Sequence, residues 1–161
     1  MWPGIAVLAF VTVQRLAELL LSQRNTRRLL ARGGYEAAAG HYPFIVTLHA
    51  LWLAVLWFFG PGPPIHVVPL ILYMLLQLGR LWVISTLGER WTTRIIILPG
   101  APLVKSGPYR WLNHPNYLIV IGEIAILPLV FDLPMVAIVF SVLNGLLLWV
   151  RIRDENKALG R

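Results

Sequence analysis

The residues most able to do chemistry lie around a short polar turn, NHPNY, that comes just before an apolar run. His114 offers a proton acceptor near neutral pH and Tyr117 a phenol, while Pro115 restricts the backbone of the turn. Glu123 follows six residues after Tyr117, inside the apolar run. Because an unpaired carboxylate in lipid is protonated or excluded, Glu123 requires a polar ligand or a cationic neighbour.

A metal ion is one candidate for that ligand. The chain contains no cysteine, which removes thiolate ligands and covalent cysteine catalysis. His114 and Glu123 alone do not have the spacing of a recognised ligand set, and Arg110 nearby disfavours a cation. We therefore expect no metal at this turn.

A nucleoside-sized zwitterion fits these residue types better. Carboxylates accept hydrogen bonds from ribose hydroxyls, Arg or His binds a carboxylate, and aromatic faces cover a base. S-adenosylmethionine answers this description, although the spacing of the residues alone does not select it.

Other polar residues lie within apolar stretches, where ionisable groups are costly and usually face a protein interior. Arg15 and Glu18 are three residues apart, so they form either a buried packing pair or substrate contacts. Arg80, beside Gln77, is expected to snorkel toward the membrane surface. An aromatic belt at that surface is the ordinary explanation for His41 and Tyr42, and His49 lies eight residues after His41, roughly on the same face. A solvated tail with ion pairs is the ordinary explanation for Asp154 and the nearby Asn144.

The elements that must position these residues are membrane helices. Hydrophobic residues make up 58% of the 161 residues and charged residues 13%. Since about 20 apolar residues span a bilayer, the sequence predicts five helices, at 2–22, 42–60, 64–86, 116–131 and 133–150. The last two are short, and we expect them to form a tilted helical hairpin around FDLP. The predicted fold class is an all-α polytopic membrane bundle in a single domain, residues 1–161.

The basic residues predict the orientation of this bundle. They fall in QRNTRRLLARGG, in the segment between the third and fourth helices, and in the tail, whereas FGPGPPIH and FDLP hold no Lys or Arg. By the positive-inside rule, the N-terminus is expected outside and the C-terminus in the cytoplasm. The net charge of +7 is therefore assigned to orientation, and no nucleic-acid partner is expected.

The sequence also predicts the structure of two further segments. The first apolar stretch has no short basic head or cleavage site, so we expect a mature spanning helix rather than a signal peptide. Residues 86–115 are too polar and too broken by Gly and Pro to span a bilayer. Within them, TTRIIIL followed by PGAPLV predicts a short extended pair joined by a turn at the membrane surface.

The stretch GPYRWLNHPNYLIVIGE resembles the GPY…RHPxY…G…E signature of the isoprenylcysteine carboxyl methyltransferase family of integral membrane enzymes, and RIRDENKAL resembles its C-terminal R…EE..L element. The wider pattern, QRLAELLLSQRN, HYPFIVTLHALW and RLWVISTLGERWTTRIIILPG, is similar to the short bacterial branch. Some members of that branch methylate alkyl-pyrones or related polyketide lipids. The resemblance implies S-adenosylmethionine as cofactor and a bacterial cell membrane as location.

In the family, the His-Pro-x-Tyr loop and a C-terminal acidic pair enclose the cofactor on the cytoplasmic side. The resemblance thus implies that approximately residues 86–161 form the cofactor-binding part. It implies cofactor contacts from one set of residues, Arg110, His114, Pro115, Asn116, Tyr117 and Glu123, and catalytic roles for a second set, Arg151 and Glu155. Two positions depart from the pattern, because Asn113 replaces an Arg before His-Pro and Asn156 replaces the second carboxylate.

The expected activity is O-methylation of a lipophilic acid or acidic enol that arrives from the bilayer. Methylation of a prenylcysteine carboxylate is the alternative within the family, whose eukaryotic members carry a further aromatic and Arg-bearing segment beyond the position of Arg161. Two non-enzymatic alternatives are a small transporter or lipid-binding protein, with a polar pathway through Glu123, and a structural membrane subunit. The residues leave the acceptor and the oligomeric state undetermined.

Overall fold

The computed structural model describes residues 2–161 and is an all-α bundle, as the sequence predicts. Its helices are α1 (Trp2–Ala31), α2 (Tyr42–Phe59), α3 (Val67–Leu87), α4 (Pro115–Val130) and α5 (Pro134–Leu159). Four of them are long and apolar enough to cross a membrane, and α4, with 16 residues, is shorter.

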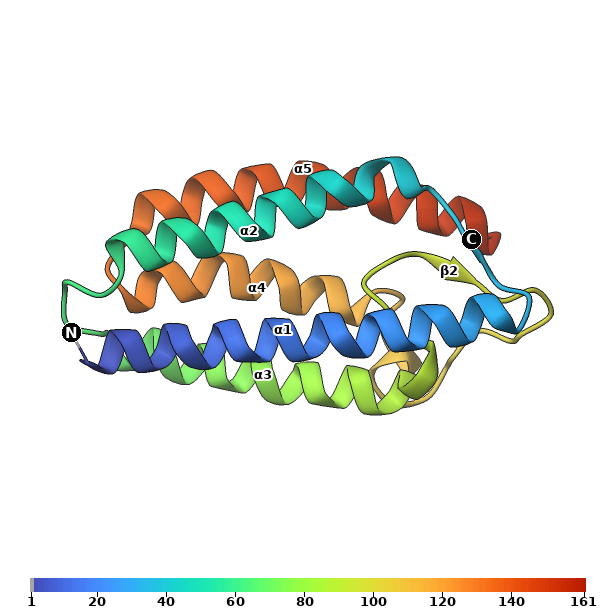
Figure 1. Cartoon of the computed structure of the whole chain (residues 1–161), viewed down its shortest axis with the longest axis horizontal. Helices are drawn as coiled ribbons and strands as arrows, with labels where there is room; N and C mark the ends of the chain where they lie inside the picture. Colours follow the sequence, from blue (N-terminus) through green and yellow to red (C-terminus); the bar gives the residue numbers. More distant parts are fainter. Residues whose placement is uncertain (1) are drawn as a thin grey trace.

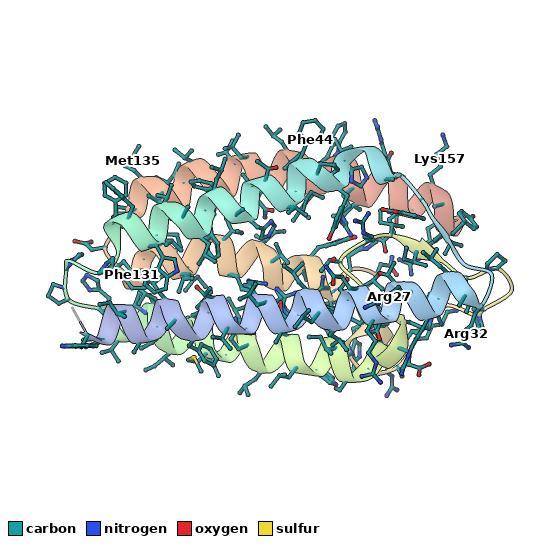
Figure 2. All side chains as sticks on the ribbon, viewed as in Figure 1. Arg27, Arg32, Phe44, Phe131, Met135 and Lys157 are labelled. Carbon is teal, nitrogen blue, oxygen red and sulfur yellow. The ribbon has the colours of Figure 1, made fainter. Side chains whose placement is uncertain are left out.

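The helices run alternately up and down, so that their connections gather at two ends (Figure 1). The N-terminus, the α2–α3 connection and the α4–α5 turn lie at one end, and the remaining connections and the C-terminus lie at the other. Figure 2 shows Arg27, Arg32 and Lys157 at the C-terminal end, and Phe131 and Met135 at the opposite end. The basic segments therefore share one end of the bundle, which we call the basic end.

The helices α1 and α5 extend beyond the ranges 2–22 and 133–150 that we predicted, reaching Ala31 and Leu159. The prediction ended each helix where charged residues begin, but Arg, Leu, Lys and Ala are good helix formers outside lipid as well. At about 1.5 Å per residue, α1 is about 45 Å long against a hydrocarbon core of about 30 Å. These added turns build the polar walls of the basic end.

The short helix α4 lies at the centre of the bundle and packs mainly against α3 and α5 (Figure 1). Its side chains Ile124 and Leu127 are fully buried in the main core cluster. A glycine on α4 permits this close packing, because a Cβ at Gly122 would lie 2.8 Å from Leu76 Cδ1 of α3. The predicted α4–α5 hairpin is present, turning through residues 131–133.

The predicted extended pair has a different partner strand. Ile96–Ile97 forms strand β2, but it pairs antiparallel with β1, Tyr35–Glu36, and PGAPLV forms no strand. The reason is that the Gly33-Gly34 turn, with Gly33 at a φ of +92°, ends α1 and brings its following residues back alongside β2. Three 3-10 turns, Ala39–His41, Gly88–Arg90 and Gly107–Arg110, complete the connections at the basic end.

Candidate active site at the basic end

A cavity of about 460 Å³ opens within the basic end of the bundle. All five helices contribute to its walls, and residues 90–98 cover it. One flank is apolar and consists of Leu16 and Leu19 on α1 and Val46 and Ala50 on α2, which we call the α1–α2 flank. Since Leu16 is 57% exposed and Val46 41%, this flank faces the lipid as well as the cavity.

The polar mouth of the cavity joins the start of α4 to the end of α5. Tyr117 donates its hydroxyl hydrogen to Glu155 at 2.5 Å and accepts from Arg151 Nε at 2.9 Å. The Tyr117 ring stacks on His114 at a centroid distance of 5.3 Å. His114 Nε2 lies 2.9 Å from Asn156 Oδ1, and its Nδ1 lies 3.6 Å from Glu155. The helix-start motif and the tail motif therefore form one cluster.

The covering segment is held to the helices at Thr93. Its hydroxyl lies 2.8 Å from Ser22 Oγ of α1 and 2.9 Å from the Tyr42 hydroxyl of α2, and its carbonyl oxygen accepts from Arg151 Nη2 of α5. Nearby, Asn25 donates a 2.8 Å hydrogen bond to the carbonyl of Trp91. Backbone and side-chain bonds to α1, α2 and α5 thus fix the cover over the cavity.

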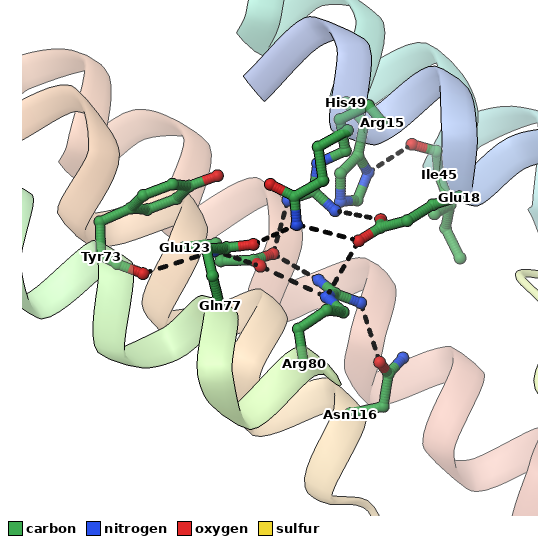
Figure 3. A network of polar contacts seen from close by, with 10 residues as sticks. Arg15, Glu18, Ile45, His49, Tyr73, Gln77, Arg80, Asn116 and Glu123 are labelled. Atoms are coloured by element: carbon green, nitrogen blue, oxygen red, sulfur yellow. Dashed lines mark hydrogen bonds and ion pairs between the residues drawn. The ribbon is translucent and has the colours of Figure 1, made fainter. Parts of the chain in front are cut away.

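Glu123 lies deeper, in a network of ion pairs that spans α1, α3 and α4 (Figure 3). Its carboxylate is fully buried and accepts from Arg15 at 2.5 Å, from Gln77 at 3.0 Å and from Arg80. Arg15 also pairs with Glu18 at 3.1 Å. The structure thus provides the cationic neighbours that the sequence required for Glu123.

Arg80 does not snorkel, contrary to the prediction. It is 2% exposed, pairs with Glu123, and donates from Nη1 to Asn116 Oδ1 at 2.8 Å. A carboxylate fixed on the neighbouring helix compensates the charge locally, so the side chain has no reason to reach the membrane surface.

The structure separates the predicted site residues into three groups. His114, Asn116, Tyr117, Arg151 and Glu155 line the cavity together. Pro115 is buried at the first turn of α4, and Glu123 lies behind Arg80, so neither side chain lines the cavity. Arg110 lines a smaller adjoining pocket with Tyr109, Asn113 and Arg161.

Burial, reinforced by Glu155, raises the pKa of Tyr109 to about 12, so this tyrosine stays protonated at neutral pH.

Several cavity residues carried no functional expectation from the sequence. Thr93 comes from the irregular segment, Tyr42 was explained as a surface-belt residue, and His49 was noted only for sharing a helix face with His41. A polar residue inside or beside an apolar run could have indicated a site in the sequence. Only the packing of α2 against the other helices shows that these residues meet at one cavity. No cluster of three or more His, Cys, Asp or Glu side chains suited to a metal occurs in residues 2–161.

A family model of isoprenylcysteine carboxyl methyltransferases matches residues 69–161, which contain the whole mouth cluster and Thr93 but not Ser22 and Tyr42, which contact Thr93. The chain belongs to the isoprenylcysteine carboxyl methyltransferase family. Membership places it among membrane methyltransferases, in agreement with its membrane-length helices. The residues of α1 and α2 that line the cavity, including Arg15 and His49, lie outside the matched range.

Two bacterial relatives are similar to this family member. The uncharacterized protein YpbQ of Bacillus subtilis (strain 168) is 37% identical over 95% of this chain and 94% of its own length. An uncharacterized Haemophilus influenzae protein is 35% identical over 48% of this chain and 46% of its own. No solved structure gives a significant match.

Proposed function

We propose that the chain is an S-adenosylmethionine-dependent O-methyltransferase whose acceptor is a lipophilic acid or acidic enol. The observation that carries this proposal is a single cavity with a polar mouth at the basic end and an apolar flank toward lipid. A soluble, charged methyl donor suits the mouth, and a lipid-soluble acceptor suits the flank. The family supports methyl transfer, and the cavity shape supports these two partners.

The mouth offers the groups that S-adenosylmethionine requires. The whole cavity, about 460 Å³ in volume, is in the range of small-molecule sites. Glu155 offers carboxylate oxygens to hydroxyls or an amino group, the stacked His114 and Tyr117 rings offer an aromatic face, and Asn116 offers an amide. In this proposal Pro115 and Glu123 act indirectly, Pro115 by starting α4 and Glu123 by holding Arg80 beside Asn116. Arg110 borders the adjoining pocket, where it adds positive charge near the mouth.

When bound, the cofactor supplies a sulfonium methyl group for in-line displacement by an acceptor oxygen. The protein's main contribution is alignment, which is worth on the order of 7–11 kcal/mol for well-oriented groups. Arg151 suits this task because Tyr117 and the Thr93 carbonyl fix its guanidinium between the mouth and the cover. A guanidinium held in this way keeps its positive charge in the cavity, where it stabilises the negative charge that develops on the acceptor oxygen during transfer.

The acceptor reaches the cavity across the α1–α2 flank in this proposal. α1 and α2 are joined near the far end of the bundle by a 2.9 Å hydrogen bond from Trp57 Nε1 to Thr12. Toward the basic end, apolar side chains of both helices line the cavity and are exposed to lipid, which favours a long alkyl chain there. The orientation proposed from the basic residues puts the mouth in the cytoplasm, where the cofactor is.

Cofactor binding is the first test. We expect His114→Ala to weaken S-adenosylmethionine binding by about tenfold or more, or about 1.4 kcal/mol, in calorimetry on the purified protein. His66→Ala is the matched control, because His66 lies at the opposite end and its side chain is 54% exposed. Unchanged affinity in a folded His114→Ala protein removes this residue from the site, and absence of binding by the native protein refutes the cofactor assignment.

The acceptor is tested by competition. The native protein in lipid, with labelled S-adenosylmethionine, is offered a long-chain hydroxypyrone and a farnesylcysteine analogue together. We expect the label in the hydroxypyrone. A clear preference for farnesylcysteine would instead establish the prenylcysteine activity after which the family is named.

A further inference from the structure

His49 on α2 lines the same cavity and has a defined tautomer. Its Nδ1 lies 2.8 Å from the carbonyl oxygen of Ile45, one turn earlier in the helix. Because a carbonyl oxygen can only accept, Nδ1 carries the proton. The neutral ring therefore keeps a lone pair on Nε2, the arrangement needed to accept a proton.

In the described part of the chain, the Nε2 atom of His49 is unpaired and not fully buried. Among residues 2–161 it has no hydrogen-bond partner, yet it is not one of the fully buried unpaired polar atoms, unlike both ring nitrogens of His41. Since the His49 side chain lines the cavity, the unused acceptor is available to a molecule inside it.

The position of His49 along the cavity suits contact with an acceptor rather than with the mouth. Tyr42, at the start of α2, reaches Thr93 in the cover, and His49 lies about 10 Å deeper at 1.5 Å per residue. Figure 3 shows the His49 ring beside Arg15. Ala50, the next residue of α2, belongs to the α1–α2 flank. His49 thus lies where the apolar flank meets the polar floor of the cavity, which Arg15, Glu18 and Arg80 form.

The charges of the floor are already balanced. Its lining groups are Arg15 and Glu18 from α1 and Arg80 from α3, and Glu123 of α4 lies directly beneath them. Each arginine has a carboxylate partner. Arg15, Arg80 and Glu123 are also the charges that act on the His49 ring. A balanced floor favours an acceptor that enters with its hydroxyl proton, since a preformed anion would find no uncompensated cation there. Such an acceptor requires a base at the moment of transfer.

We infer that His49 is a further catalytic residue, the general base that removes the acceptor's hydroxyl proton. This inference rests on the proposed function. In the step, the acceptor oxygen forms a bond to the methyl carbon, and the carbon–sulfur bond of the sulfonium donor breaks with its electron pair passing to sulfur. The hydroxyl proton passes to His49 Nε2, leaving a methyl ether or ester, a thioether and an imidazolium that returns its proton to water.

The experiment compares methyl transfer by the native protein, His49→Gln and His49→Asn in lipid. The acceptors are two long-chain hydroxypyrones that differ in acidity through a ring substituent. Gln and Asn both remove the base, while Asn preserves a donor to the Ile45 carbonyl and thus the packing of α2. We expect kcat to fall by about a hundredfold or more, with unchanged S-adenosylmethionine affinity. His66→Gln is the control and should keep native kcat.

The dependence on acceptor acidity separates a base from a structural residue. The loss of kcat should be larger for the less acidic hydroxypyrone, because an acceptor that ionises readily needs less help from a base. Native kcat in both variants, or an equal loss for both acceptors, overturns the role of His49 and leaves the proposed function intact. If the native protein transfers no methyl group to either acceptor, the proposed function fails and the inference fails with it.

Discussion

At the scale of single residues, Glu123 shows how an intramembrane charge determines its surroundings. The carboxylate is fully buried and accepts hydrogen bonds from Arg15 and Arg80, which come from helices far from it in sequence. Burying any one of these charges alone would cost several kcal/mol, so the group is stable only as a set. The network therefore couples the packing of α1, α3 and α4 to the position of Arg80 in the cavity wall.

We expect Glu123→Gln to lower the free energy of unfolding by about 3–5 kcal/mol, because the buried Arg80 and the partly buried Arg15 lose their shared carboxylate. Unfolding of the detergent-solubilised protein, followed by circular dichroism, measures the effect. Glu89→Gln is the control, since the side chain of Glu89 is 59% exposed where it pairs with Arg28 and Arg32. The control should change stability by less than about 1 kcal/mol. A Glu123→Gln protein as stable as the control would show that the network contributes little.

At the scale of elements, the short helix α4 connects the two functional clusters. Its first turn supplies His114 and Tyr117 to the mouth, and its middle supplies Glu123 to the network under the floor. Close packing against α3 holds both in register. A Cβ at Gly122 would meet Leu76 and one at Gly79 would meet Ile119, so both glycines lie at the α3–α4 interface.

We expect Gly122→Leu to destabilise the protein by about 1–3 kcal/mol and to weaken cofactor binding, because the new side chain would overpack the α3–α4 interface and displace Arg80 from Glu123. Thermal unfolding and calorimetry are the measurements. Gly145→Leu is the matched control: Gly145 also lies within a helix, but a Cβ there would meet nothing within 4 Å. Equal effects of the two substitutions would argue against a specific close approach at Gly122.

At the scale of the whole molecule, the end-to-end separation of charge is the main feature. The basic connections, the cavity mouth and the C-terminus share one end, while the α2–α3 connection and the α4–α5 turn lie at the other (Figure 1). This arrangement supports the proposal that the basic end faces the cytoplasm. The mouth then meets the soluble cofactor, and the α1–α2 flank remains at the depth of the lipid.

Topology reporters test that orientation. A reporter fused after Arg161 should behave as cytoplasmic, and one inserted at Gly62, in the α2–α3 connection, should behave as external. A Cβ at Gly62 would meet nothing within 4 Å, so an insertion there should leave the helices intact. The reverse pattern of reporters would invert the bundle and place the mouth outside the cell.

The sequence by itself determined the features that depend on local composition. Apolar runs of membrane length identified the bundle, and NHPNY with RIRDENKAL identified the family, because these signals need no knowledge of distant neighbours. Helix ends were placed too early in α1 and α5, since hydropathy reports lipid contact rather than backbone hydrogen bonding.

Only the tertiary structure decided how residues far apart in sequence meet. It paired Ile96–Ile97 with Tyr35–Glu36, buried Arg80 against Glu123, and brought His49 and Arg15 to the floor of one cavity. A charged side chain in a helix has the same local sequence signal whether it reaches solvent or a partner on another helix. The difference lies in the balance between desolvation and pairing, which depends on the packing of the whole bundle.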